Sequence, residues 1–241
     1  MVFGGSARWL TGGGMGPGGG RRWGNRNRRD GGWDQDGVAG NVSEFRAHHT
    51  GGTPLAQMAH SNGWSLLQSM PTYEDGTDLD LSGGPFAVGR YHPIPPIVQG
   101  QAGYWTFWAL SVSAMTRGAQ WRSYALTFMQ LGGAVPFVHV YPEAWRASIT
   151  SVTQEVHLES GAFNDRFATF AKDAQTVYGL LNPRTMQLLL DSPPVDEIWT
   201  AGQFVCISRI DAHHGEALGA HLNLLTSIAV GVPSSLFERG L

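Results

Sequence analysis

The sequence predicts an α+β domain with a mainly antiparallel sheet. Three observations support this prediction. Strand-length apolar runs, separated by Gly, Pro or polar residues, follow one another from 85 to 142, as in an antiparallel meander. Two short segments with helical apolar spacing lie within 174–192, and an amphipathic helical segment spans 215–232 near the end of the chain. Strands followed by helices in one segment favour the α+β class.

Composition limits the classes of function. At 241 residues, with 42% hydrophobic and 15% charged residues, the chain can bury a sizeable core. The formal net charge of −3 gives no overall electrostatic case for binding nucleic acid or an anionic membrane. The single cysteine, Cys206, excludes an internal disulfide and a Cys-rich zinc site, and we interpret it as a buried, inert thiol.

No targeting signal is visible, and no apolar run approaches the roughly 20 residues that a membrane helix needs. We therefore expect a cytoplasmic protein without a membrane span.

The first 52 residues differ from the rest, and we predict a disordered arm and hinge over 1–52, followed by a single domain over 53–241. Residues 1–40 hold 14 of the 33 glycines and almost no aliphatic side chains, so they cannot bury enough surface to offset the entropy of ordering. Arginines and tryptophans interleave in "GGGRRWGNRNRRDGGW", which is typical of a tail that binds RNA or DNA. The candidate nucleic-acid contacts are Arg21, Arg22, Trp23, Arg26, Arg28 and Arg29. A plain flexible linker, or sequence added by an upstream start codon, explains the arm equally well.

The domain opens with a helix and a short strand. In "TPLAQMAHSNG", Thr53 is the expected N-cap, Pro54 the first helical residue, and Asn62 with Gly63 the stop. "WSLLQSM" (64–70) predicts a strand, and a polar loop leads to further strands at "PFAVGR" and "IPPIVQG".

The central hairpin has two apolar faces. "QGQAG" predicts its connection, and beyond it Tyr104, Thr106 and Trp108 alternate with Trp105 and Phe107. Because both sets are apolar, this sheet lies inside a sandwich or barrel, or has one face covered by a helix or a partner.

The C-terminal half predicts a strand at "FNDRFATFA" (163–171) and then two helices. Asp173 is the N-cap of the first helix, and Asn182 with Pro183 separates it from the second. A hairpin turns at Ala201 and Gly202. The closing helix carries its apolar stripe on Leu218, Leu222, Leu225 and Ala229.

The stretch "LESGAFNDRFATFAKDAQTVYGLLNPRTMQLLL" resembles the E-S-x-x-F-N-x-x-F pattern of a family of uncharacterised actinobacterial proteins, in which a Pro-Arg-Met-like step leads to a run of leucines. The resemblance is most specific over 158–190 and extends from Leu55 to Leu236. It departs from the common spelling at Gly161 and Ala162 and at Thr185 and Met186. It implies a fold and supplies no catalytic residues.

Polar residues in that stretch have a structural interpretation. Glu159 or Asp165 is expected to pair with Arg166 or Arg184 and so fix how the strand meets the helix pair. No G-x-S-x-G elbow surrounds Ser160, and nothing places a base beside it, so no catalytic residue is predicted.

Metal sites are weakly indicated. The candidate ligands are His213, His214 and His221, in a spacing that matches no known zinc signature. The carboxylates of "YEDGTDLDL" lack the EF-hand order and predict a solvated acidic turn. We expect no cofactor and no bound metal.

The leading hypothesis is a non-enzymatic protein-interaction or scaffold module whose partner is another protein or a second copy of the chain. Tryptophan and tyrosine are enriched at binding hot spots. The predicted interaction face is therefore aromatic and comprises Tyr104, Trp105, Phe107, Trp108, Trp121 and Tyr124. The alternatives are a nucleic-acid-associated protein that uses the arm, and an unrecognised metal-dependent enzyme that uses the three histidines.

Overall fold

The computed structural model describes residues 53–72, 79–81, 83–86, 91–115, 121–148, 153–211, 213 and 215–237. All of them belong to one compact unit, Glu44–Leu241. The predicted arm and hinge, 1–52, lie outside the described residues. The fold is α+β with an antiparallel sheet, as the sequence predicts.

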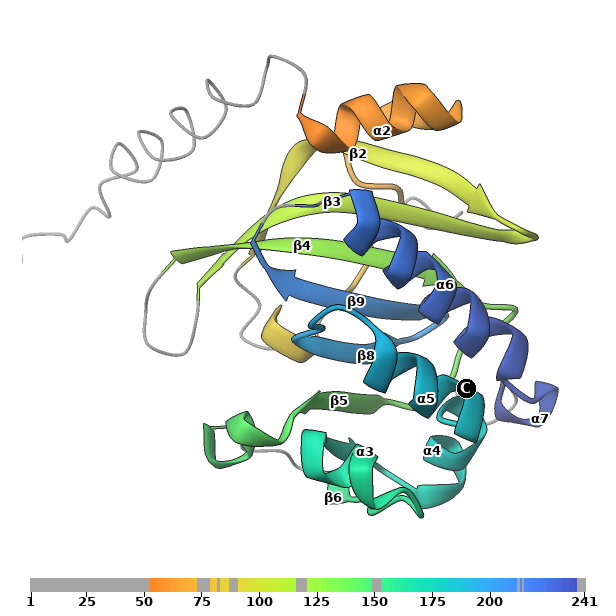
Figure 1. Cartoon of the computed structure of the whole chain (residues 1–241). Coiled ribbons are helices and arrows are strands. Elements are labelled where there is room, and N and C mark those ends of the chain that lie inside the picture. Colours follow the sequence, from red (N-terminus) through yellow and green to blue (C-terminus); the bar gives the residue numbers. More distant parts are fainter. Residues whose placement is uncertain are drawn as a thin grey trace, which may run out of the picture. The chain divides into compact units, whose positions relative to one another are not determined.

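The sheet has nine strands in the order β1-β2-β3-β4-β9-β8-β5-β7-β6 (Figure 1). Every strand pair is antiparallel. The strands are β1 (Ser65–Leu67), β2 (Tyr91–Ala102), β3 (Trp105–Met115), β4 (Trp121–Gln130), β5 (Val138–Pro142), β6 (Gln154–Glu155), β7 (Phe167–Ala171), β8 (Glu197–Ala201) and β9 (Phe204–Ile210).

The helices gather on one face of the sheet, with α6 lying across β4 and β9 (Figure 1). They are α2 (Pro54–Asn62), α3 (Gly161–Arg166), α4 (Ala174–Leu180), α5 (Pro183–Asp191), α6 (Gly215–Gly231) and α7 (Ser234–Phe237), with two 3₁₀ turns, η1 (Gly84–Phe86) and η2 (Glu143–Ser148).

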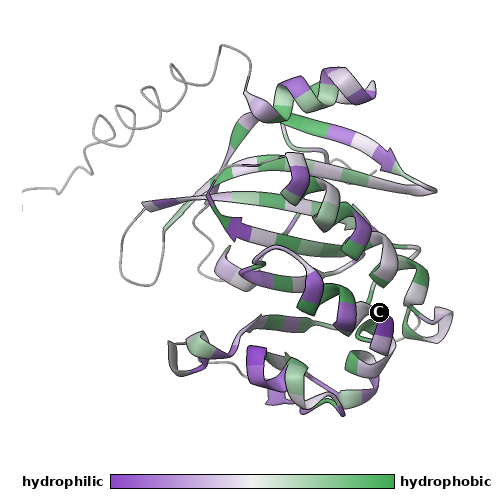
Figure 2. Cartoon of the chain, in the orientation of Figure 1, coloured by the Kyte–Doolittle hydropathy of each residue, from purple (hydrophilic) through white to green (hydrophobic). Residues whose placement is uncertain are grey.

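Two buried layers line the two faces of the sheet. On the helix face, Phe107 and Ala109 of β3 pack with residues of the helices. On the opposite face, Trp108 and Leu110 pack with Phe86 and its neighbours from the segment before β2. Apolar colour runs along the central strands in Figure 2. The two-faced pattern of β3 therefore arises because helices cover one face and an irregular segment covers the other.

Local capping explains the helices that the sequence predicts. Thr53 accepts a hydrogen bond from the Ala56 amide at the start of α2, and Asp173 does the same for Thr176 in α4. Asn182 caps α5, with Pro183 at its first position. These side chains stabilise helix ends by satisfying amides that have no partner within the helix.

The predicted strand over 163–171 is only half correct. Its first part is α3, because Ser160 caps the helix by accepting a hydrogen bond from the Phe163 amide. Phe163 and Phe167 alternate as strand residues do, but they are also four apart, and their rings lie 5.1 Å apart across the helix end. The strand begins only at Phe167.

The predicted strand over 85–90 starts as a 3₁₀ turn, and residues 87–90 are outside the described part of the chain. Gly83 and Gly84 have φ values of 125° and 52°, which turn the backbone into Trp199. A Cβ on Gly84 would lie 2.5 Å from the Trp199 ring. This close approach lets Phe86 pack edge-on against Trp199, at 5.5 Å between ring centroids.

Two predicted boundaries also move. The strand predicted over 64–70 is confined to Ser65–Leu67. The central hairpin turns at Gly103 and Tyr104, because β2 continues through most of the predicted connection to Ala102. Gly103, with φ 63°, makes this tight turn possible.

Candidate functional site

The predicted aromatic face is divided by the fold. Phe107, Trp108 and Tyr124 are 0%, 5% and 6% exposed, so the structure places them in the core and not on a surface. Phe107 meets Trp64 edge to face at 5.0 Å, and Trp108 stacks on Phe128 at 5.1 Å. Sequence alternation could not distinguish the two roles, because both faces of β3 are covered.

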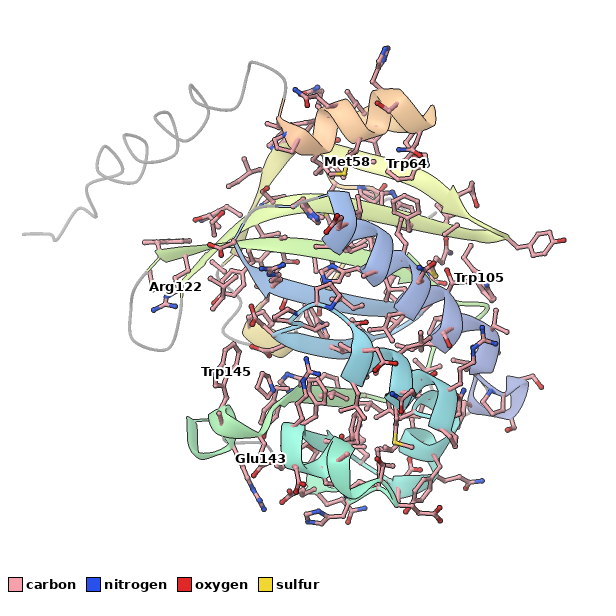
Figure 3. All side chains as sticks on the ribbon, viewed as in Figure 1. Met58, Trp64, Trp105, Arg122, Glu143 and Trp145 are labelled. Atoms are coloured by element: carbon pink, nitrogen blue, oxygen red, sulfur yellow. The ribbon has the colours of Figure 1, made fainter. Side chains whose placement is uncertain are left out.

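The remaining three residues do not share a surface. Tyr104 is fully exposed at the tip of the β2–β3 hairpin, and Trp105 packs partly against the helix-side core. Trp121 is opposite Met115, at the other end of the strands, where it stacks on His92 at 5.4 Å. Trp105 and Arg122, the neighbour of Trp121, lie at opposite ends of the sheet in Figure 3.

A groove lies at the hairpin end, between β2 and the turn that joins α2 to β1. Its volume is about 390 Å³, and it is lined by Asn62, Gly63, Trp64, Ser65, Gln99, Gly100 and Gln101. None of these side chains is charged. We call these seven residues together with Tyr104 and Trp105 the hairpin-end surface.

Gly100 and Trp64 shape one wall of the groove. A Cβ on Gly100 would lie 2.6 Å from the Phe107 ring and 2.7 Å from Trp64. Only glycine therefore allows the two rings to pack against this part of β2. Trp64 follows the Gly63 cap of α2 and lies beneath the end of that helix (Figure 3).

Two amides of the groove are already occupied within the protein. The Asn62 side chain donates to the Met58 carbonyl at 2.8 Å, and Gln101 donates to Thr106 Oγ1 at 2.9 Å. These bonds hold the two sides of the groove in place. The sequence signal that points to the groove is the glycine within a strand in "QGQ", a pattern typical of close backbone approach.

Arg166 does not make its predicted ion pair. Its Nη1 donates to the Leu190 carbonyl at the end of α5, at 2.5 Å, and its guanidinium lies 5.2 Å from the Phe167 ring. Glu159, Asp165 and Arg184 are exposed, and none forms an ion pair with a residue that the structure describes. Arg166 does link α3 to α5, but through a backbone carbonyl, because the helical turn of 161–166 directs it toward the end of α5.

The histidine candidates are buried instead of solvated. His213 Nε2 donates to the Leu110 carbonyl at 2.9 Å, and His221 is 1% exposed on α6. Neither ring nitrogen of His221 has a hydrogen-bond partner among the described residues. Burial, together with the nearby His213 and Arg209, lowers the pKa of His221 to about 4.

No group of three or more His, Cys, Asp or Glu side chains arranged to hold a metal occurs among the residues that the structure describes. His214 is outside them, as are the carboxylates Glu74, Asp75 and Asp78 of the acidic turn. The predicted nucleic-acid contacts of the arm also lie outside the described residues.

Sequence reasoning missed a buried pair between β5 and β8. His139 Nε2 donates to Glu197 Oε2 at 2.7 Å, and both side chains are below a tenth exposed. The Tyr141 ring lies 4.9 Å from His139. Burial raises the pKa of Tyr141 to about 12, with smaller contributions from Glu155 and Glu143. The residues of the pair are 58 positions apart, so no local motif reveals them.

Cys206 is fully buried, and burial raises the pKa of its thiol well above its usual value. Reactive cysteines need an accessible thiolate, so the interpretation as an inert core residue fits this position.

Comparisons with known proteins are sparse. No family model matches the chain, and no curated protein matches it. One solved structure is similar: the crystal structure of the mycobacterial trehalose monomycolate transport factor A, TtfA, has a TM-score of 0.47 and 10% sequence identity, over 73% of this chain and 92% of that chain. A likeness this distant assigns no function. Within the described ranges, no helix is both long and apolar enough to span a bilayer.

Proposed function

We propose that this chain is a non-enzymatic protein-binding module that contacts another protein through the hairpin-end surface. The observation that carries the proposal is Tyr104, a large side chain held fully exposed at the tip of a long hairpin, beside an open groove. Tyrosine contributes disproportionately to protein interfaces because it buries much area at low entropic cost and keeps a polar end.

The hairpin gives this tyrosine a firm support. The turn is closed by the pair Ala102 and Trp105, and Trp105 packs partly against the core. A rigid display lowers the ordering cost of binding. The uncharged groove next to it favours a partner surface of neutral, hydrogen-bonding groups over an ionic one.

The test uses a photo-crosslinking amino acid in place of Tyr104 in the full-length chain, expressed in its native host. Position 178 is the matched control, because Tyr178 is 52% exposed on α4, away from the hairpin. We expect a defined protein to crosslink to position 104 and not to position 178.

Affinity for the purified crosslinked protein then decides the matter. Tyr104→Ala should weaken binding by about tenfold or more, as removal of a hot-spot tyrosine does, and Tyr178→Ala should leave it within about twofold. Equal affinities of the native chain and Tyr104→Ala would overturn the proposal.

A further inference from the structure

We propose that the groove receives an extended, uncharged segment of the partner protein, which adds as a strand beside the open end of β2. This inference rests on the proposed function and names the way in which the partner binds. It follows from the direction of the backbone groups of β2, from the position where β1 begins, and from the distribution of proline along β2.

The hairpin turn sets the direction of the backbone groups. Gly103 has a positive φ of 63° and Tyr104 does not, which is the pattern of a two-residue type II′ turn. Such a turn closes with a hydrogen bond between the residues on either side of it, here Ala102 and Trp105. Because hydrogen-bonded and non-hydrogen-bonded pairs alternate in an antiparallel ladder, the amide and carbonyl of Gln101 point away from β3.

On that outer side, β1 does not reach Gln101. β1 begins at Ser65, which is opposite Gln99. Gln99 is two residues before Gln101, so its backbone groups point the same way and are the ones that β1 uses. Among the described residues, no strand pairs with Gln101 on this side. The groove occupies this position, with the residues that join α2 to β1 as its opposite wall.

The proline distribution sets this end of β2 apart. Before the stretch paired with β1, β2 carries Pro93, Pro95 and Pro96, which have no amide to offer an added strand. Beyond that stretch it carries neither proline nor charge, although exposed edges are usually blocked in one of these ways. The open edge is therefore confined to the groove, next to Tyr104.

An occupant of this position needs an extended backbone and no charge beside the groove. Its backbone groups would pair with Gln101, and its side chains would alternate between Trp64 on one face and solvent on the other. Since only a short length of β2 is open, contact with Tyr104 must supply much of the affinity.

The test uses the full-length chain and a library of 12-residue peptides displayed on phage. A selected peptide is synthesised again with one backbone amide methylated at a time. We expect methylation at every second position over a short stretch to weaken binding about tenfold, the loss that removal of a hydrogen bond with its partner left unpaired can produce. Intervening positions should change little. A scan without alternation, or a library that yields no binder, would overturn the inference.

Two variants test the same point on the protein. Gln101→Pro removes the outward amide, leaves the β2–β3 hydrogen bonds in place, and should lower peptide affinity about tenfold. Gln101→Ala keeps the amide, removes only the side chain, and should bind within about twofold of the native chain. A thermal melt establishes that both variants fold. If Gln101→Pro folds and binds the peptide as the native chain does, strand addition is wrong.

These results separate the two proposals. If Tyr104→Ala weakens binding of the crosslinked partner and Gln101→Pro does not, the binding module stands and strand addition falls. If neither variant matters, both fall. A dimer of this chain that Gln101→Pro dissociates, measured by sedimentation, would show that the edge pairs with a second copy and would overturn the assignment to another protein.

Discussion

His221 shows how a single buried side chain makes stability depend on pH. Its ring lies on the sheet side of α6, without a hydrogen-bond partner in the described part of the chain, and the basic groups near it are His213 and Arg209. Protonation there adds a buried charge beside two basic groups, so the folded state strongly favours the neutral ring.

We expect this residue to destabilise the protein in mild acid. The unfolded chain protonates the ring near pH 6.5, but the folded chain resists until about pH 4. Stability is therefore full above pH 6.5 and falls as the pH drops toward 4, by about 2 kcal/mol between pH 7 and pH 5. Urea unfolding at both pH values measures it, and His221→Leu should lose this part of the dependence. An unchanged pH slope in the variant would contradict the assignment.

Gly84 is a second position where one residue decides the packing. Gly84→Ala places a methyl group 2.5 Å from the Trp199 ring at a φ of 52°. We expect a loss of about 2–3 kcal/mol in the free energy of unfolding, because backbone strain and steric clash add.

Gly63→Ala is the matched control for Gly84→Ala. Gly63 also has a positive φ, 68°, but no atom lies within 4 Å of the position that an added methyl group would take. Its replacement should cost only about 1 kcal/mol of backbone strain. Equal losses in urea unfolding would show that the Trp199 contact contributes nothing.

At the scale of elements, the junction between β5 and β8 depends on a side-chain pair. The two strands share only the register pairs His139 with Trp199 and Val140 with Ile198. The His139–Glu197 hydrogen bond reinforces this short ladder from the face opposite the helices. β7 and β6 attach to the sheet through β5 and so depend on the same junction.

Glu197→Gln should weaken this junction selectively. Removing the charge of one partner leaves His139 buried with a poorer acceptor, and loss of a partner from a buried pair costs about 3 kcal/mol or more when it is complete. Hydrogen exchange should accelerate in β5 and β7 more than in β2 and β3. Uniform acceleration across the sheet would show that the pair supports the whole fold and not this junction.

At the scale of the whole molecule, the folded unit and the arm can be tested separately. All residues of the hairpin-end surface lie within Glu44–Leu241. We expect a chain of residues 44–241 to melt at the same temperature as the full chain and to bind the crosslinked partner with the same affinity.

The full chain and residues 44–241 also distinguish the alternative function of the arm. If the arm binds nucleic acid, only the full chain should bind single-stranded RNA, and its affinity should fall steeply with added salt. Partner binding that is lost with residues 1–43 would instead transfer the binding function from the hairpin to the arm.

Most of the fold was predictable because its signals are local. Thr53, Asp173 and Asn182 mark helix starts, and apolar alternation marks β3, β4 and β9. The strand predicted at 163–171 was wrong in its first half because phenylalanines at positions 163 and 167 fit either period. A capping serine then selected the helix.

Less of the candidate site was predictable. Tyr104 was among the predicted face residues, but the alternation that grouped it with Trp108 says nothing about which one is covered. That depends on Phe86, which approaches the sheet from a segment outside the hairpin. The His139–Glu197 pair and the groove beside Gln101 likewise combine residues that are far apart in sequence.

The amino-acid sequence alone determined the α+β class, the helix starts and the two-faced strands of this protein, because backbone capping and side-chain periodicity act over a few residues. Only the tertiary structure decided which aromatic side chains are core, which histidines are buried, and where β2 is left open. Those outcomes depend on the order of strands in the sheet and on what covers each face, and residues close in sequence do not encode either one locally.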